Sequence, residues 1–244
     1  MPPSTDFLER DLRDIFAGRL QSFVAYGTHA YDASLGHQAH GDSHAPDRRA
    51  VHTLAIVDTL TADDLRACAE RVSTWHNAGA ATPLLLAAHE FARSLDAFPL
   101  EFGAIVADHI VVSGKDPFAG LRVDPTDLRR ACEVQARSHL LHLREGVLET
   151  RGRADALAVL IVDSAPAFAA LLENVARLQG VAADPTAVSR HAERTLNLPG
   201  GIVSDVMKLA GVAEISSAEA LRIFPAYLDV VERLVKFVDG WNVR

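Results

Sequence analysis

The spacing of apolar residues changes near residue 124, and this change limits the folds open to the chain more than any other feature. Before it, short apolar runs that fit strands alternate with segments of helical spacing, which is the pattern of a mixed α/β domain. After it, from Pro125 onward, the spacing is helical almost throughout. We therefore predict an α/β (α+β) fold with two domains. Residues 1–124 form a mixed sheet with flanking helices, and residues 125–244 form an all-helical domain.

The beginning of the chain predicts a helix followed by two strands. Residues 5–16 have the spacing of an amphipathic helix, and the run LQSFVAY predicts a buried strand that closes on Gly27 and Thr28. A loop rich in glycine, histidine and aspartate follows, and AVHTLAIVD at residues 50–58 predicts the second strand. Short apolar runs of this kind also fit the buried strands of other α/β domains.

This unit resembles the start of the nucleotidyltransferase fold of the polymerase beta superfamily. In that family the turn is Gly-Ser, and the second strand opens with an Asp-x-Asp pair that holds two magnesium ions around the nucleotide triphosphate. In this chain the turn is Gly27-Thr28, and the pair falls on Val51 and Thr53, with His52 between them. Mg²⁺ takes oxygen ligands, above all carboxylates, so Val51 offers it nothing and Thr53 only a neutral hydroxyl. The resemblance therefore implies a pseudoenzyme, with the fold of a transferase but without its metal chemistry.

The resemblance is strongest over residues 98–148. The string FPLEF, the turn VVSGKDPFAGL and the helix LRRACEVQARSHLLHLREGVLE are similar to the middle of uncharacterised bacterial proteins in which a degenerate nucleotidyltransferase domain precedes helices. We predict strands at residues 99–107 and 109–112, and the resemblance places the third carboxylate of the family at Glu101. The alternative is that Glu101 pairs with a basic side chain of the next helix, because buried acids are normally paired.

Three arginines recur every seven residues on the helix predicted for residues 127–149 and form one stripe opposite an apolar face. They are Arg130, Arg137 and Arg144. Glu133 lies nearby on the same helix, so a solvent-exposed face with ordinary ion pairs is the simpler interpretation. The alternative is a ligand site in which the arginines meet Gly27, Thr28 and Glu101 and receive a phosphate or carboxylate through bidentate contacts.

The loop over residues 29–47 is another candidate for chemistry. It contains several histidines and aspartates, among them His37, His40 and His44. Imidazole and carboxylate suit zinc or nickel, but structural zinc generally takes four ligands, and no cysteine is nearby. Glycines and a proline disfavour the helix that would bring the three histidines to one face. We interpret the segment as a polar loop and these histidines as weak metal candidates.

The composition narrows the range of partners. The formal net charge is -8, whereas non-specific binding of nucleic acid depends on lysines and arginines that release counterions, so we expect no long nucleic acid. Cys68 and Cys132 lie in helical patterns without a partner at metal-ligand spacing. No signal peptide or membrane-length apolar run is visible. We expect a cytoplasmic protein with free thiols and no membrane partner.

The helical half ends in an amphipathic helix. Four helices are predicted before it, over residues 127–149, 155–179, 185–195 and 202–209. Pro166 predicts a kink or a break in the second of them. The last helix begins at Ser216 with Glu219 three residues on, a capping-box pattern, and carries a long apolar stripe. Packing within a bundle explains this stripe, and a homodimer or partner face is the alternative.

These observations lead to one functional hypothesis and two alternatives. We expect a catalytically degenerate nucleotidyltransferase-like protein, without a cofactor, that binds a nucleotide, another small anion or a protein partner. The first alternative is an active Mg²⁺-dependent transferase whose carboxylates come from elsewhere, and the acids nearby are Asp58, Glu101, Asp42 and Asp47. The second is a structural dimer or partner-binding protein that needs no ligand site, since a fold by itself does not specify an activity.

Overall fold

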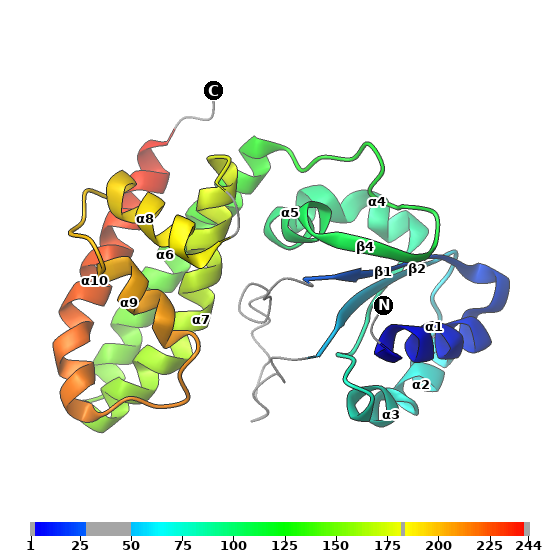
Figure 1. Ribbon diagram of the computed structural model, residues 1–244, viewed down its shortest axis with the longest axis horizontal. Coiled ribbons are helices and arrows are strands. Elements are labelled where there is room, and N and C mark those ends of the chain that lie inside the picture. The colour runs from blue at the N-terminus through cyan, green and yellow to red at the C-terminus, as the bar shows by residue number, and fades with distance from the viewer. Residues whose placement is uncertain (1–2, 28–49, 182–183, 242–244) are drawn as a thin grey trace. The chain divides into compact units, whose positions relative to one another are not determined.

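The computed structural model describes residues 3–27, 50–181 and 184–241. Among these residues, one compact unit extends to Val123 and a second begins at Asp124. The first unit is a mixed α/β structure built on a four-stranded sheet, and the described part of the second consists of helices and their connections (Figure 1). The predicted fold class is therefore confirmed.

The sheet is mixed and has the strand order β3-β2-β1-β4. Its strands are β1 (Leu20–Tyr26), β2 (His52–Val57), β3 (Leu84–Ala87) and β4 (His109–Gly114). β1 runs antiparallel to β2 and to β4, whereas β2 and β3 are parallel. The two central strands, β1 and β2, are buried along most of their length, which explains why both are nearly continuous apolar runs in the sequence.

Three helices cover one face of the sheet (Figure 1). They are α1 (Pro3–Phe16), α2 (Ala62–Ala69) and α3 (Val72–Asn77). Leu8, Leu12 and Phe16 repeat every four residues along α1 and form one fully buried cluster with Phe23 of β1. The repeat that predicts an amphipathic helix is thus the repeat that packs it on the sheet.

The sequence pattern favours one helix from Thr61 to about residue 75, but the structure divides this segment into α2 and α3. Thr61 and Asp64 form a capping box at the start of α2, and the chain turns at Glu70 and Arg71 before α3 begins. Arg71 forms an ion pair with Asp11 of α1 at 2.9 Å, and the buried indole of Trp75 donates a hydrogen bond to the same carboxylate at 2.9 Å. These contacts with α1 lie at the point where the helix is interrupted. They are tertiary, so local helix propensity does not predict them.

Two helices cover the opposite face of the sheet, α4 (Ala88–Ala97) and α5 (Pro99–Ala107). The prediction of a strand at residues 99–107 is wrong, because this segment is α5. A short apolar run does not distinguish a buried strand from a buried helix. Pro99 occupies the first helical turn, where its missing N–H costs nothing, and the buried Phe102 and Ile105 are three residues apart, as on one helix face.

The second unit contains five helices in its described residues. They are α6 (Pro125–Glu149), α7 (Ala154–Leu178), α8 (Pro185–Thr195), α9 (Ile202–Leu209) and α10 (Ser217–Gly240). α6, α7 and α10 pack against one another, and α8 and α9 pack against α7. Gly146 lets α6 approach α7 closely, because a Cβ there would lie 2.5 Å from Cδ1 of Leu160. Of the kink or break predicted at Pro166, the break does not occur, because α7 continues through the proline; Ala165 and Phe168 near it are buried in the core.

The final helix begins where the sequence predicts. The hydroxyl of Ser216 accepts a hydrogen bond from the backbone N–H of Glu219 at 3.2 Å. Part of the apolar stripe packs inside the helical unit, where Val231, Leu234 and Val238 are buried.

The apolar helix α7 is, among the described residues, the one helix long and apolar enough to cross a membrane by length and composition. The expectation that no apolar run has membrane length is therefore wrong for α7. Half of its most apolar stretch is buried inside the protein, and a core helix meets the same criterion. Its contacts with α6 and α10 account for the apolar composition.

Candidate functional site

Three side chains form a row across one end of the sheet. Tyr26, the last residue of β1, lies opposite His52 of β2 on one side and opposite His109 of β4 on the other. Residues directly opposite each other in antiparallel strands project from the same face, so the three share one side of the sheet. The rings of Tyr26 and His52 are 5.8 Å apart. Gly27 follows with a positive φ of 68°, and its N–H bonds to the carbonyl of Asp108 at 3.2 Å.

Glu101 belongs to this end of the sheet. Burial raises the pKa of the Tyr26 phenol, and the negative charge of Glu101 raises it further. The position of Glu101 on α5 corrects the prediction that a strand carries it.

The residues predicted to replace the metal-binding pair lie on the other face. Thr53 is opposite Ala25 and two residues before Ala55, which packs in the cluster with α1. It is 1% exposed, and its Oγ1 has no hydrogen-bond partner among the described residues. The register with Tyr26 puts His52 on the opposite face, that of Tyr26, and Ala50 lies two residues before it, outside β2. Thr53 therefore faces packed side chains, on the face of the sheet opposite to Tyr26.

His109 is held firmly in this row. Its Nδ1 is 3.1 Å from the carbonyl oxygen of Ile105, and its Nε2 is 3.3 Å from Oδ1 of Asp116. The ring of Phe118 meets the imidazole edge to face at 4.8 Å. With a backbone partner, a carboxylate partner and an aromatic neighbour, His109 closes one side of the row as a structural residue.

The arginine row of α6 has partners within the helical unit. Arg137 pairs with Asp239 at 2.8 Å and with Glu133 at 3.5 Å, and Arg144 pairs with Glu232 at 2.7 Å. Asp239 and Glu232 belong to α10, so these arginines join two helices of the bundle. Gly27 and Glu101 lie in the other unit. The interpretation as a face with ion pairs is supported, with partners on α10 that helix periodicity alone does not predict.

Arg130 differs from the other two arginines of the row. It is exposed and forms no ion pair with any residue that the structure describes.

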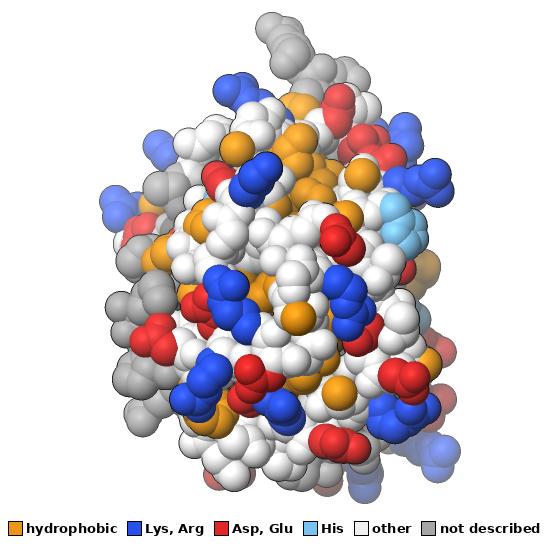
Figure 2. Space-filling view, turned by 90° about the vertical axis from the view of Figure 1, so that its right-hand side faces the viewer, with side chains coloured by type: hydrophobic (Ala, Val, Ile, Leu, Met, Phe, Trp, Pro, Cys, Tyr) orange, Lys and Arg blue, Asp and Glu red, His pale blue; other side chains and the backbone are white. Residues whose placement is uncertain are grey.

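Figure 2 shows one face of the molecule, on which basic and acidic side chains are interspersed. That face offers no segregated basic surface of the kind that holds nucleic-acid phosphates.

Several predicted site residues lie outside the described residues. They are Thr28, the histidines His37, His40 and His44, and the acids Asp42 and Asp47. Within the described ranges, no group of three or more His, Cys, Asp or Glu is placed to hold a metal ion.

Cys68 and Cys132 are buried free thiols, and burial raises the pKa of both, that of Cys132 to about 12.

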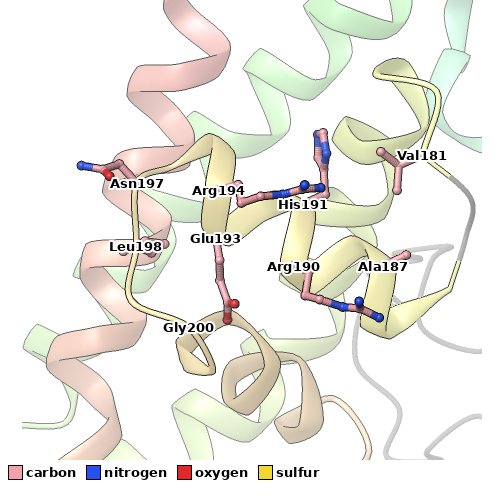
Figure 3. Close-up of a pocket in the computed structure, with 9 residues that line it drawn as sticks. All are labelled: Val181, Ala187, Arg190, His191, Glu193, Arg194, Asn197, Leu198 and Gly200. Atoms are coloured by element: carbon pink, nitrogen blue, oxygen red, sulfur yellow. The ribbon is translucent and has the colours of Figure 1, made fainter.

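A hollow of about 700 Å³ on the helical unit was not predicted (Figure 3). It lies along the exposed side of α8 and is lined by Arg190, His191 and Arg194 together with Asn197 and Leu198. The sequence does contain a signal, because Arg190 and Arg194 are four residues apart and therefore neighbours on one helix face. Nothing in the sequence shows whether acids neutralise them.

In comparison with known proteins, no protein-family model matches this chain, and no curated protein matches it significantly. The resemblance to nucleotidyltransferases therefore stays a prediction.

Proposed function

We propose that this chain is a nucleotidyltransferase-like protein that lacks metal-dependent transfer activity and acts by binding a nucleotide or another small anion. One observation carries the proposal: the residue of β2 opposite Tyr26 is His52, and Ala50, two residues earlier and just outside β2, is not a carboxylate either. The order α1, β1, Gly27 and β2 in a mixed sheet supports the resemblance in fold.

The chemistry of magnesium explains why these residues matter. Mg²⁺ prefers near-octahedral oxygen coordination and is usually anchored by carboxylates together with substrate phosphates. Glu101 alone supplies one carboxylate, Ala50 supplies no ligand, and the imidazole of His52 is a nitrogen ligand that suits zinc or copper better. Without two ions to neutralise the phosphates and align the attack, phosphoryl or nucleotidyl transfer loses its main stabilisation.

The active alternative draws one acid from the end of β2, and this acid, Asp58, does not lie at this end of the sheet. Asp58 follows the last residue of β2, six residues from His52, so at about 3.3 Å per residue it lies roughly 20 Å away. It accepts a hydrogen bond from Gln21 there. Of the acids considered for this role, Glu101 is the one described residue placed near Tyr26.

The test restores the missing acids. Wild-type protein and the double variant Ala50→Asp/His52→Asp are titrated with ATP, with and without Mg²⁺, and assayed for nucleotidyl transfer. We expect no Mg²⁺-dependent ATP binding by the wild type and a gain of at least about tenfold in Mg²⁺-dependent affinity in the variant. Adding Glu101→Gln should remove the gain, and Ala50→Asn/His52→Asn is the uncharged control. Mg²⁺-dependent transfer by the wild type would overturn the absence of catalysis.

A second candidate function, self-association through the helical unit, has its own observation. Val134, Leu141 and Leu148 recur every seven residues on α6 and are 64%, 64% and 78% exposed. Large apolar residues aligned on one exposed helix face are typical of association surfaces. Light scattering after gel filtration should show a dimer that Leu141→Glu dissociates, whereas Leu221→Glu, at a residue 58% exposed on α10, serves as the matched control. A monomer at all concentrations would exclude this function.

A further inference from the structure

The hollow along α8 has the size and lining of a small-molecule site. Its volume, about 700 Å³, falls within the range of roughly 300–1,000 Å³ that is typical of ligand pockets. Its lining combines apolar residues, Ala187 near the start of α8 and Leu198 beyond its end, with the arginine and asparagine side chains. An apolar wall beside a few convergent polar groups is the usual composition of such a site.

The two arginines of the hollow differ from those of α6 because they lack carboxylate partners. Arg190 and Arg194 are exposed, and neither forms an ion pair within the described residues. The hydrogen bond of Arg190 runs from Nε to the carbonyl oxygen of Thr186 at 3.3 Å, which satisfies one donor and neutralises no charge. Both guanidinium groups therefore keep donors for a ligand.

The one acid in the hollow is engaged elsewhere. Glu193 is 8% exposed, and its Oε1 accepts a hydrogen bond from the backbone N–H of Val203 at 3.0 Å. Val203 lies in the first turn of α9, where free N–H groups favour a carboxylate. Glu193 thus stabilises the start of α9 and makes no ion pair with Arg190 or Arg194 in this structure.

His191 lies beside these charges and is itself neutral. Burial lowers the pKa of its imidazole, and the charge of Arg194 lowers it further. Its Nε2 is hydrogen-bonded to Oε1 of Gln179 at the end of α7. Figure 3 shows the Arg194 side chain extending toward His191. The imidazole therefore fixes one edge of the hollow without adding positive charge.

Asn197 is another polar residue of the hollow, and its backbone is held in place. Its backbone has a positive φ of 52°, and its carbonyl oxygen accepts a hydrogen bond from Nη1 of Arg233 on α10 at 3.1 Å. Arg233 also reaches the carbonyl of Leu196, so α10 anchors the connection after α8. The exposed Asn197 side chain then offers both a donor and an acceptor.

From these contacts we infer that the α8 hollow binds a phosphate monoester of a compact organic molecule. Arg190 and Arg194 hold the phosphate, and the organic part lies against Leu198. Guanidinium groups match phosphate oxygens through paired hydrogen bonds, which compact ammonium groups do not. The inference shares only its ligand class with the proposed function and uses none of the residues near Tyr26.

Calorimetric titration without Mg²⁺ tests the site with ribose 5-phosphate and AMP, and with ribose and adenosine as uncharged controls. We expect both phosphates to bind and both uncharged probes to fail. Arg190→Ala and Arg194→Ala should each weaken binding at least about tenfold. Arg130→Ala, which removes one exposed unpaired arginine from α6, should leave the affinity unchanged. Arg194→Lys should recover only part of the loss, because it restores the charge without the fork.

Three results would overturn the inference: no heat with either phosphate, equal weakening by Arg130→Ala, or equal binding of adenosine and AMP. Binding of AMP without ribose 5-phosphate would equally reject a site defined by its phosphate. A failure here leaves the acid-restoration experiment untouched, because that experiment depends on Mg²⁺ and on Glu101. Conversely, Mg²⁺-dependent ATP binding that survives both arginine substitutions would contradict only the proposed function.

Discussion

The two units keep their inner ionisable groups in opposite states. In the α/β unit, Asp64 is charged: Arg19 donates to its two oxygens at 2.7 and 2.8 Å, and these bonds with those from Thr61 hold its pKa well below the usual range. In the helical unit, His139 is neutral: burial lowers its pKa to about 4, and the charge of His142 adds to this. Its Nε2 bonds to the Tyr227 hydroxyl at 2.9 Å.

Asp64 and His139 should respond differently to acid, because an ion pair with Arg19 keeps Asp64 charged whereas burial keeps His139 neutral. The stabilisation that Asp64 provides is complete above the carboxyl's unfolded pKa of about 3.8–3.9 and is lost only as the pH falls below it. His139 behaves differently because its unfolded form takes up a proton below about pH 6.5, while the folded form resists until about pH 4. The helical unit should therefore weaken at a pH where the α/β unit does not.

Mild acid should produce the largest effect. Lowering the pH from 7 to 4 should cost the helical unit up to about 3 kcal/mol, since a pKa difference of one unit corresponds to about 1.4 kcal/mol. The lowered pKa of His191 acts in the same direction. Each unit has its own tryptophan, Trp75 in the first and Trp241 in the second. Urea unfolding of the single-tryptophan variants Trp241→Phe and Trp75→Phe, followed by fluorescence at several pH values, measures the two units separately.

Removing the histidine should remove most of this pH dependence. His139→Gln should flatten the stability of the helical unit between pH 6.5 and 4, although it also lowers stability at neutral pH by disturbing the stacking on Phe168. The remaining slope belongs to His191. Equal acid sensitivity of both tryptophan signals would contradict the contrast between the units.

An intermediate effect is expected from Asp64→Asn in the α/β unit. The change removes the charge that Arg19 pairs with and weakens the cap on α2, at a cost of about 1–2 kcal/mol, given that Arg19 is partly in water. Asp63→Asn is the matched control: it lies one residue away, is well exposed and pairs only with Arg66 along the helix. Urea unfolding at pH 7 should separate the two variants, and equal losses would show that local charge, not the Arg19 pair, stabilises this corner.

The smallest effect should come from Arg144→Ala on α6. Its bond to Glu232 joins two helices, but both side chains are largely exposed, so the loss should stay below about 1 kcal/mol. Urea unfolding reported by Trp241 measures it. A loss well above 1.5 kcal/mol would mean that the α6 arginines stabilise the bundle more than surface pairs do.

Periodicity and capping residues predict much of this fold. The change from an α/β to a helical pattern, the capping residue Thr61 and the capping residue Ser216 all correspond to observed features. Residues 99–107 were mispredicted because an apolar run of this length fits either a strand or a helix, and the packing that decides between them, such as that of Phe102 against Phe91 of α4, is tertiary.

The candidate sites were harder to predict than the fold. Register was the obstacle in the sheet: an apolar run does not reveal which of its residues, such as His52 and Thr53, face Tyr26 and which face α1. Distance was the obstacle in the helices, because Asp239 and Glu232, which neutralise the α6 arginines, are far along the chain. In the sequence alone, Arg190 and Arg194 of α8 cannot be distinguished from the arginines of α6.

The central position of β1 has a consequence for synthesis on the ribosome. β2 can pair with β1 early, whereas β4 emerges only after α2 to α5 have been translated. Until then β1 presents an open row of backbone donors and acceptors to neighbouring nascent chains. Translation that stalls between Asn77 and Asp108 would leave this edge exposed, so that interval is where the emerging chain most needs a chaperone.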